Sequence, residues 1–229
     1  MYHVRNWCTP GAYAELARTN RELSLSKVKD LEFQTIQVQP AGVWVQNTCL
    51  KPSVALQAIK EVGQGEGVLL LDADAHFERE PEWKPLLSAF FGYVRWTRPN
   101  SGALIALSGT LWITHTVQCI QFLESWRARC KLDDTKWDQA HMWEQVKHNV
   151  ASPGQGDILE MDWRWAYMEG NSIEPRGQAW VVHSQASREL KDATATAQPD
   201  SAQITPSETD AELREKTGPH TGGRRKKLE

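Results

Sequence analysis

Residues 67–83, GVLLLDADAHFEREPEW, decide the fold that we expect for this chain. The run GVLLL is too short for a helix and too apolar for an edge strand. It is typical of a strand that is buried on both faces of a parallel sheet. Asp72 and Asp74 follow this strand directly, with Ala73 between them. A buried strand has no structural need for two acids at its end, so we interpret the pair as ligands of something held there.

The chain before this strand alternates between strand and helix patterns. Two strand patterns and two apolar stripes with helical spacing alternate in the order strand, helix, strand, helix over residues 2–7, 12–25, 32–40 and 51–63. Pro10 is expected in the first turn of the first helix. The order β-α-β-α-β predicts an α/β fold with an open, mostly parallel sheet flanked by helices.

The chain after the acid pair continues this architecture. Further strands are predicted over residues 90–96, 103–109, 157–168 and 178–184, and further helices over residues 114–130 and 137–148. Ser108, Gly109 and Thr110 are expected to break one of these strands, and the glycine permits either a close approach or a simple bulge.

The composition divides the chain at about residue 190. Residues 1–190 are predicted to form a single domain, which is an ordinary size for one. Residues 191–229 are polar, contain Pro and Gly, have no aromatic residue and end in a basic run. Such a segment buries too little apolar area to offset its chain entropy, so a disordered tail is predicted.

Charge and cysteine content favour a cytoplasmic protein. The formal net charge is −3, so no overall field attracts nucleic acid or an anionic membrane. The apolar runs are too short for a membrane span, and the N-terminus lacks the apolar region of a secretory signal. The four cysteines form no C-x-x-C pair, which indicates reduced thiols rather than a zinc site or a disulfide framework.

The acid pair suits a divalent cation. Ligands bind outside the carboxyl ends of the strands in an open parallel sheet, and side chains two positions apart in an extended chain point the same way. Two carboxylates in one small space repel unless a cation neutralises them or one of them takes up a proton. Mg²⁺ or Mn²⁺ is often bound by such carboxylates together with phosphate oxygens. The alternative is a polar turn that happens to follow a strand.

Several segments, in order, resemble a known enzyme family. KPSVALQAIKE (51–61) followed by GVLLLDADAHFEREPEW resembles the core of GT-A-fold nucleotide-diphospho-sugar glycosyltransferases, with Asp72-Ala73-Asp74 as the DxD motif. The segments at 101–126, 136–143 and 179–188 resemble the family's small-residue turn and helix, the DQ segment of its retaining members and its late histidine strand. The resemblance covers residues 2–190 and implies a GT-A, Rossmann-like sheet.

The resemblance implies a metal site at the DxD motif. Asp74 is expected to bind Mn²⁺ or Mg²⁺ directly, and Asp72 to bind the metal or the ribose. His183 is expected to complete the site from the opposite side. His76 lies closer in sequence and remains the alternative imidazole ligand.

The resemblance also implies positions for the donor. Asp138 is expected to accept hydrogen bonds from the donor sugar, with Gln139 beside the reacting carbon, although Asp138 also suits a helix N-cap. Lys51 and Arg188 are expected to contact the diphosphate, and Thr9 and Pro10 are expected to contact the base and ribose. Gly109 is expected to let the ligand or another backbone segment approach closely.

The function implied is metal-dependent transfer of a sugar, with retention, from a nucleoside-diphosphate sugar with uridine as base to an unidentified acceptor. Inversion would need a carboxylate base, for which Asp162 or Glu160 would serve. A hydroxymethylated base in phage DNA is the alternative acceptor, which would place the protein in a host cytoplasm. The rivals are a sugar-nucleotide-binding module without catalysis and another metal-dependent phosphate-ester enzyme.

Overall fold

The chain folds around a mostly parallel, six-stranded sheet. The computed structural model describes residues 1–97, 102–150 and 157–185. The strand order is β2-β1-β3-β6-β5-β7. Their bounds are Tyr2–Cys8 for β1, Leu31–Gln37 for β2, Gly67–Asp72 for β3, Phe91–Thr97 for β5, Leu104–Thr114 for β6 and Ile158–Met161 for β7. The pairs β1–β2, β1–β3 and β5–β7 are parallel, and β6 runs antiparallel to β3 and β5. The predicted α/β class is confirmed.

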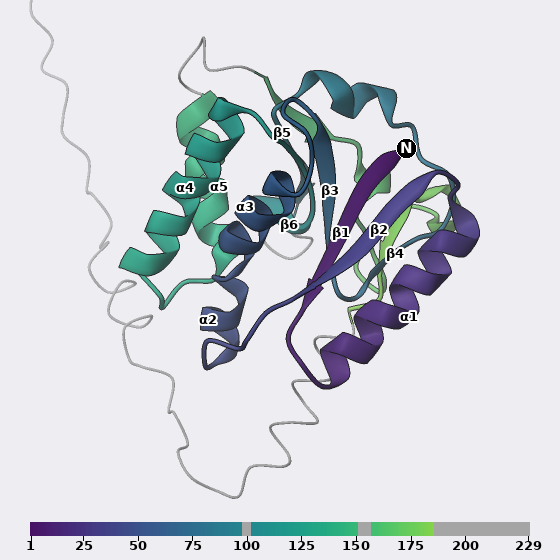
Figure 1. Cartoon of the computed structure of the whole chain (residues 1–229), viewed down its shortest axis with the longest axis horizontal. Helices are drawn as coiled ribbons and strands as arrows, with labels where there is room; N and C mark the ends of the chain where they lie inside the picture. The colour runs from purple at the N-terminus through teal and green to yellow at the C-terminus, as the bar shows by residue number, and fades with distance from the viewer. Residues whose placement is uncertain (98–101, 151–156, 186–229) are drawn as a thin grey trace, which may run out of the picture. The chain divides into compact units, whose positions relative to one another are not determined.

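Helices cover the sheet, as Figure 1 shows. They are α1 (Ala12–Lys27), α2 (Trp44–Thr48), α3 (Lys51–Lys60), α4 (Val117–Leu132) and α5 (Asp138–Val150). Val68 and Leu70 of β3 belong to the core cluster that α3, α4 and α5 share. Leu69 and Leu71 belong to a second cluster on the other face. The prediction that this strand is buried on both faces is therefore confirmed. Within the described residues, no helix has the length and apolar content to cross a membrane.

A smaller sheet joins the chain after the acid pair to the last described strand. Its order is β4-β9-β8, with β4 at Ala75–Phe77, β9 at Val181–His183 and β8 at Tyr167–Met168. Strands β4 and β9 are antiparallel, and Ala75 lies opposite His183. This pairing brings residue 183 next to the acid pair, although the two are far apart in sequence.

The prediction of one continuous strand over 157–168 is wrong, because this segment forms two short strands. β7 ends at Met161, and the 3₁₀ helix η2 (Trp163–Trp165) separates it from β8. Asp162 causes the turn, since its side chain accepts a hydrogen bond of 2.9 Å from the backbone N–H of Arg164. The strand predicted over 178–184 likewise shortens to β9 because the 3₁₀ helix η3 (Arg176–Gln178) precedes it. The short elements α2, β4 and the 3₁₀ helix η1 (Lys84–Ser88) were not predicted.

The start of α1 also differs from the prediction. The helix begins at Ala12, so Pro10 precedes it instead of occupying its first turn. Gly11 is the N-cap residue and has φ of 86°, a left-handed conformation that glycine adopts without a steric penalty.

Strand β6 is not broken at residues 108–110 but bulged there. Leu107 pairs with Val94 of β5, and Leu111 pairs with Tyr93, so the three residues between them have no partner in the β5–β6 register. On the other edge of β6, Thr110 still pairs with Leu71 of β3. A bulge of this kind redirects side chains locally while the strand continues.

Candidate active site

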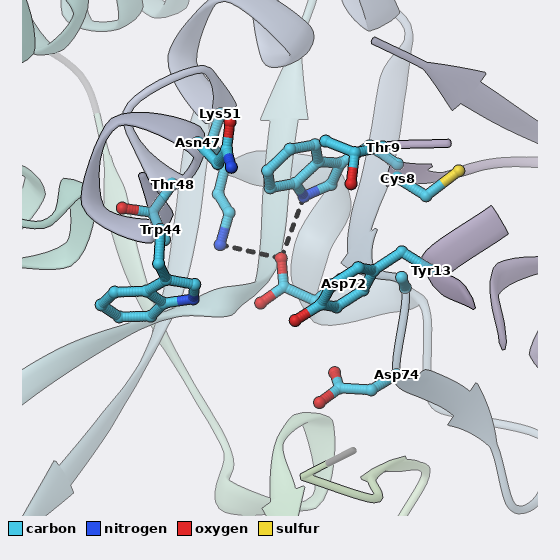
Figure 2. A pocket seen from close by; sticks show the side chains of 11 residues that line it. Cys8, Thr9, Tyr13, Trp44, Asn47, Thr48, Lys51, Asp72 and Asp74 are labelled. Carbon is cyan, nitrogen blue, oxygen red and sulfur yellow. Dashed lines mark hydrogen bonds and ion pairs between the residues drawn. The ribbon is translucent and has the colours of Figure 1, made fainter. Parts of the chain in front are cut away.

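Asp72 ends β3 and is held from two directions. Its Oδ1 accepts a hydrogen bond of 3.0 Å from the indole Nε1–H of Trp7, its register partner on β1. The same Oδ1 lies 2.8 Å from the ammonium of Lys51, as Figure 2 shows. The side chain keeps about a third of its surface exposed, so Asp72 is anchored but open on one side.

His183 and Asp74 meet beside Asp72. The Nδ1 of His183 lies 3.4 Å from Oδ1 of Asp74, and its Nε2 lies 2.8 Å from the hydroxyl oxygen of Thr110. The backbone N–H of Ser184 donates a hydrogen bond of 3.1 Å to the carbonyl oxygen of Asp74. One potential ligand atom from each of Asp72, Asp74 and His183 lies within 4.8 Å of the others. We call these three residues the acid corner.

The acid corner fits a divalent cation. Two carboxylates and an imidazole are a donor set that such ions accept. Thr110 contacts Nε2 of His183, so Nδ1, which faces Asp74, is the ring nitrogen that could bind a cation. A Cβ atom on Gly109 would lie 2.7 Å from Cε1 of His183 and 3.2 Å from Oδ2 of Asp72. Any side chain there would intrude on the corner, so glycine keeps the space clear.

The charges around Asp74 favour its ionised form. Burial alone would raise the pKa of this carboxyl, but the hydrogen bond and charge of His183 and the charge of Lys51 outweigh burial and lower the pKa. Asp74 is therefore held as a carboxylate, which is the form that binds a cation.

Lys51 links the acid corner to the bulge and to α5. Its ammonium donates hydrogen bonds to the carbonyl and hydroxyl oxygens of Ser108, at 3.0 and 3.1 Å, and lies 3.5 Å from Oδ2 of Asp138. Burial would lower the pKa of Lys51, but the charges of Asp138 and Asp72 outweigh it and raise the pKa. Lys51 is therefore a fixed positive charge between two carboxylates.

Asp138 is the first residue of α5 and is almost fully buried. The indole N–H of Trp126 donates a hydrogen bond of 2.9 Å to its backbone carbonyl. Among the described residues, no group forms a hydrogen bond with its side-chain Oδ2, although Lys51 lies nearby. Gln139 follows it and is half-buried. A buried carboxylate oxygen without a hydrogen bond can still accept one from a ligand.

An open pocket adjoins the acid corner and has aromatic walls (Figure 2). It encloses about 650 Å³, part of which is open solvent. Thr9 and Tyr13 lie on one side of Asp72, and Trp44 with Lys51 lies on the other. The full lining is Trp7, Cys8, Thr9, Tyr13, Trp44, Asn47, Thr48, Lys51 and residues 72–74. Burial, followed by the charges of Asp74 and Asp72, raises the pKa of Tyr13.

The structure gathers most but not all of the sequence-predicted residues. Lys51, Asp72, Asp74, Gly109 and His183 meet at the acid corner, as the contacts above show. Thr9 lines the pocket, whereas Pro10 beside it is exposed. Arg188 lies outside the described residues.

The alternative candidates have other partners. Nε2 of His76 lies 3.6 Å from Oε2 of Glu78, and among the described residues His76 does not belong to the group of potential metal ligands. Glu160 forms an ion pair of 2.9 Å with Arg95, and Asp162 caps η2. Glu160 and Asp162 do not line the pocket, and neither do Asp138 and Gln139.

Sequence reasoning missed several residues of the site: Trp7, Tyr13, Trp44, Thr48 and Thr110. The register that pairs Trp7 with Asp72 would have identified Trp7, but a single sequence does not contain that register. Thr110 lay in the segment that was expected to break a strand. The remaining residues lie on the first turn of α1 or on α2, and no motif marks either position.

The fold is shared with solved glycosyltransferase structures. A glycosyltransferase involved in the glycosylation of the major capsid of PBCV-1 superposes with a TM-score of 0.63 at 15% identity, over 84% of this chain and 98% of that chain. Mouse xyloside xylosyltransferase 1, in its apo form, superposes with a TM-score of 0.53 at 13% identity, over 81% and 98%. No protein-family model and no curated protein sequence matches the chain. The likeness confirms the glycosyltransferase-type fold that the sequence resemblance implied.

Proposed function

We propose that this chain is a metal-dependent glycosyltransferase that moves a sugar from a nucleoside-diphosphate sugar to an acceptor. One observation carries the proposal: Asp72, Asp74 and His183 converge beside an open pocket at the carboxyl end of β3. The two structural neighbours are glycosyltransferases of the same fold, which supports this chemistry over that of other phosphate-ester enzymes.

Asp72, Asp74 and His183 would hold Mn²⁺ or Mg²⁺. This site offers both oxygen and nitrogen donors. Because Mg²⁺ prefers oxygen ligands, the mixture favours Mn²⁺. When bound, the ion supplies a Lewis acid that stabilises the charge on the leaving diphosphate. The Thr9 and Tyr13 side of the pocket would take the base and ribose, with uridine as the proposed base.

The residues near α5 would act on the donor sugar. Asp138 would accept hydrogen bonds from its hydroxyl groups, and Gln139 would lie beside the anomeric carbon. In the retaining reaction, the bond from that carbon to the phosphate oxygen breaks, the bond to the acceptor oxygen forms, and the acceptor proton passes to the leaving phosphate. Glu160 pairs with Arg95 and Asp162 caps η2. These contacts support retention, because inversion needs a free carboxylate base.

The acceptor is left as a hydroxyl-bearing molecule. Modified DNA would favour a basic surface near the site. On α4, however, Arg127 pairs with Glu124 and Arg129 donates a hydrogen bond of 3.0 Å to Gln145. These arginines are therefore engaged within the protein, and they add no support for a DNA acceptor.

The decisive experiment incubates the full chain with Mn²⁺ and a panel of UDP-sugars, with and without EDTA. Released UDP measures turnover, and NMR of the first sugar product identifies its anomer. We expect metal-dependent UDP release, with the donor's anomeric configuration kept. UDP binding without UDP release from any donor would favour the non-catalytic binding module, and the absence of both binding and release would overturn the proposal.

A further inference from the structure

Trp7 contacts both partners of the ion pair at the end of β3. Its indole N–H donates the 3.0 Å hydrogen bond to Oδ1 of Asp72. Its ring centroid lies 5.8 Å from the ammonium of Lys51, within range of a cation–π contact. Trp7 is half-buried and lines the pocket, so it lies at the boundary between the core and the site.

The two oxygens of Asp72 are not equivalent. Oδ1 receives both the Trp7 hydrogen bond and the Lys51 contact. Oδ2 lies on the Gly109 side, toward His183. Two donors on one oxygen fix the rotation of the carboxylate, because turning it would break both contacts at once.

We propose that Trp7 is a positioning residue that turns Oδ2 of Asp72 into the acid corner as a ligand for a divalent cation. The inference rests on the proposed function, since it concerns the same corner. Groups that orient metal ligands usually change metal affinity by about 10–100-fold when they are removed. Trp7 acts through Asp72 and needs no contact with the ion itself.

The test compares two substitutions that each remove an indole donor. Trp7→Phe removes the N–H that reaches Asp72 and keeps an aromatic ring. Trp83→Phe is the matched control, because the N–H of Trp83 also reaches a carboxylate, Glu80, at 3.2 Å, in a different core cluster. Trp7→His retains a ring N–H and serves as the rescue variant. Binding of Mn²⁺ is measured by the loss of the free-ion EPR signal, with Mn²⁺ alone and with Mn²⁺ plus UDP.

We expect Trp7→Phe to weaken Mn²⁺ binding at least about tenfold, Trp83→Phe to change it less than about twofold, and Trp7→His to recover part of the loss. The measurement with Mn²⁺ alone excludes an effect through contact between the ring and a nucleotide. Unchanged affinity in Trp7→Phe, or an equal loss in Trp83→Phe, would overturn the inference while leaving the proposed function intact. A wild-type protein that binds no Mn²⁺ in either condition would overturn both.

Discussion

Two clusters of charged residues lie near β1, and they differ in whether their side chains surround a common space. On β1, the buried Arg5 donates hydrogen bonds to Glu61 at 3.1 Å and to Glu32 at 2.9 Å. His3 lies 2.6 Å from Glu32 on the other side. In the acid corner, by contrast, two carboxylates and an imidazole face a common space.

The difference separates a structural network from a binding site. Every charge of the Arg5 cluster has an opposite partner within the fold, so it is complete without a ligand. In the acid corner, Lys51 pairs with Asp72 and His183 lies beside Asp74, yet one potential ligand atom of each corner residue still lies within 4.8 Å of the others, as a bound cation would require. Arg5 and Trp7 lie two positions apart on β1 and point to the same side, so one strand serves both clusters.

The largest expected effect comes from removing a corner carboxylate. Asp74→Ala should reduce metal-dependent UDP release at least about 1,000-fold, or about 4 kcal/mol of transition-state stabilisation, because the cation loses a ligand. The control is Glu61→Gln in the Arg5 cluster, which should retain activity. If Asp74→Ala released UDP as fast as the wild type, even with EDTA present, the acid corner would be no more a binding site than the Arg5 cluster is.

Lys51→Met should cause the next largest effect, on stability. It leaves Asp138 buried without its cation, and the free energy of unfolding should fall by about 3 kcal/mol. Arg5→Met should cost less, because Glu32 and Glu61 are about a third exposed and can be hydrated. Urea unfolding of the two variants measures the comparison, and a larger loss in Arg5→Met would contradict it.

The contribution of Lys51 to stability should depend on pH in the alkaline range. Its pKa is raised in the fold, so its ion contacts stabilise the protein fully below the ordinary value of 10.5 and are lost as the pH rises through the raised value. The difference in unfolding free energy between wild type and Lys51→Met should therefore narrow above pH 10.5. A difference that stays constant at alkaline pH would show that Lys51 contributes by packing and not by charge.

Gly109→Ala should have a moderate effect confined to the corner. The added methyl group would meet His183 and Asp72, so Mn²⁺ binding should weaken about tenfold with little loss of stability. Gly177→Ala is the control, because a Cβ there meets nothing within 4 Å. Isothermal titration with Mn²⁺ and UDP would measure both, and equal affinities would mean that the corner is not where the cation binds.

The smallest effect is expected from the candidate bases outside the pocket. Glu160→Gln and Asp162→Asn should each change turnover less than about twofold, because Glu160 pairs with Arg95 and Asp162 caps η2. A loss of two orders of magnitude in either variant, with a normal melting temperature, would indicate an inverting reaction instead.

Periodicity predicted the elements whose burial is regular. The strand at 67–72 was identified from its apolar run, and its end placed Asp72 at the carboxyl edge of the sheet. The prediction was wrong where local features interrupt the pattern. A hydrogen bond to the side chain of Asp162 divides the strand expected over 157–168. The bulge at 108–110 resembles the end of a strand in the sequence. Both effects act over two or three residues, below the length that an apolar pattern reveals.

The site was predictable where a motif marked it and not where packing made it. Asp72, Asp74 and His183 were expected together from the resemblance, and the structure brings them together. Trp7 and Thr110 orient these residues through a strand register and a bulge, and neither is encoded in spacing along one chain.

The pairing of β4 with β9 makes the acid corner depend on two segments that are far apart in the sequence. Asp74 precedes β4, whereas His183 ends β9, so the set is incomplete until a late segment of the chain has docked against an early one. On the ribosome, the emerging chain would lack the complete set of proposed cation ligands until β9 had left the exit tunnel. Cation uptake would therefore report the completion of this domain in a refolding or translation experiment.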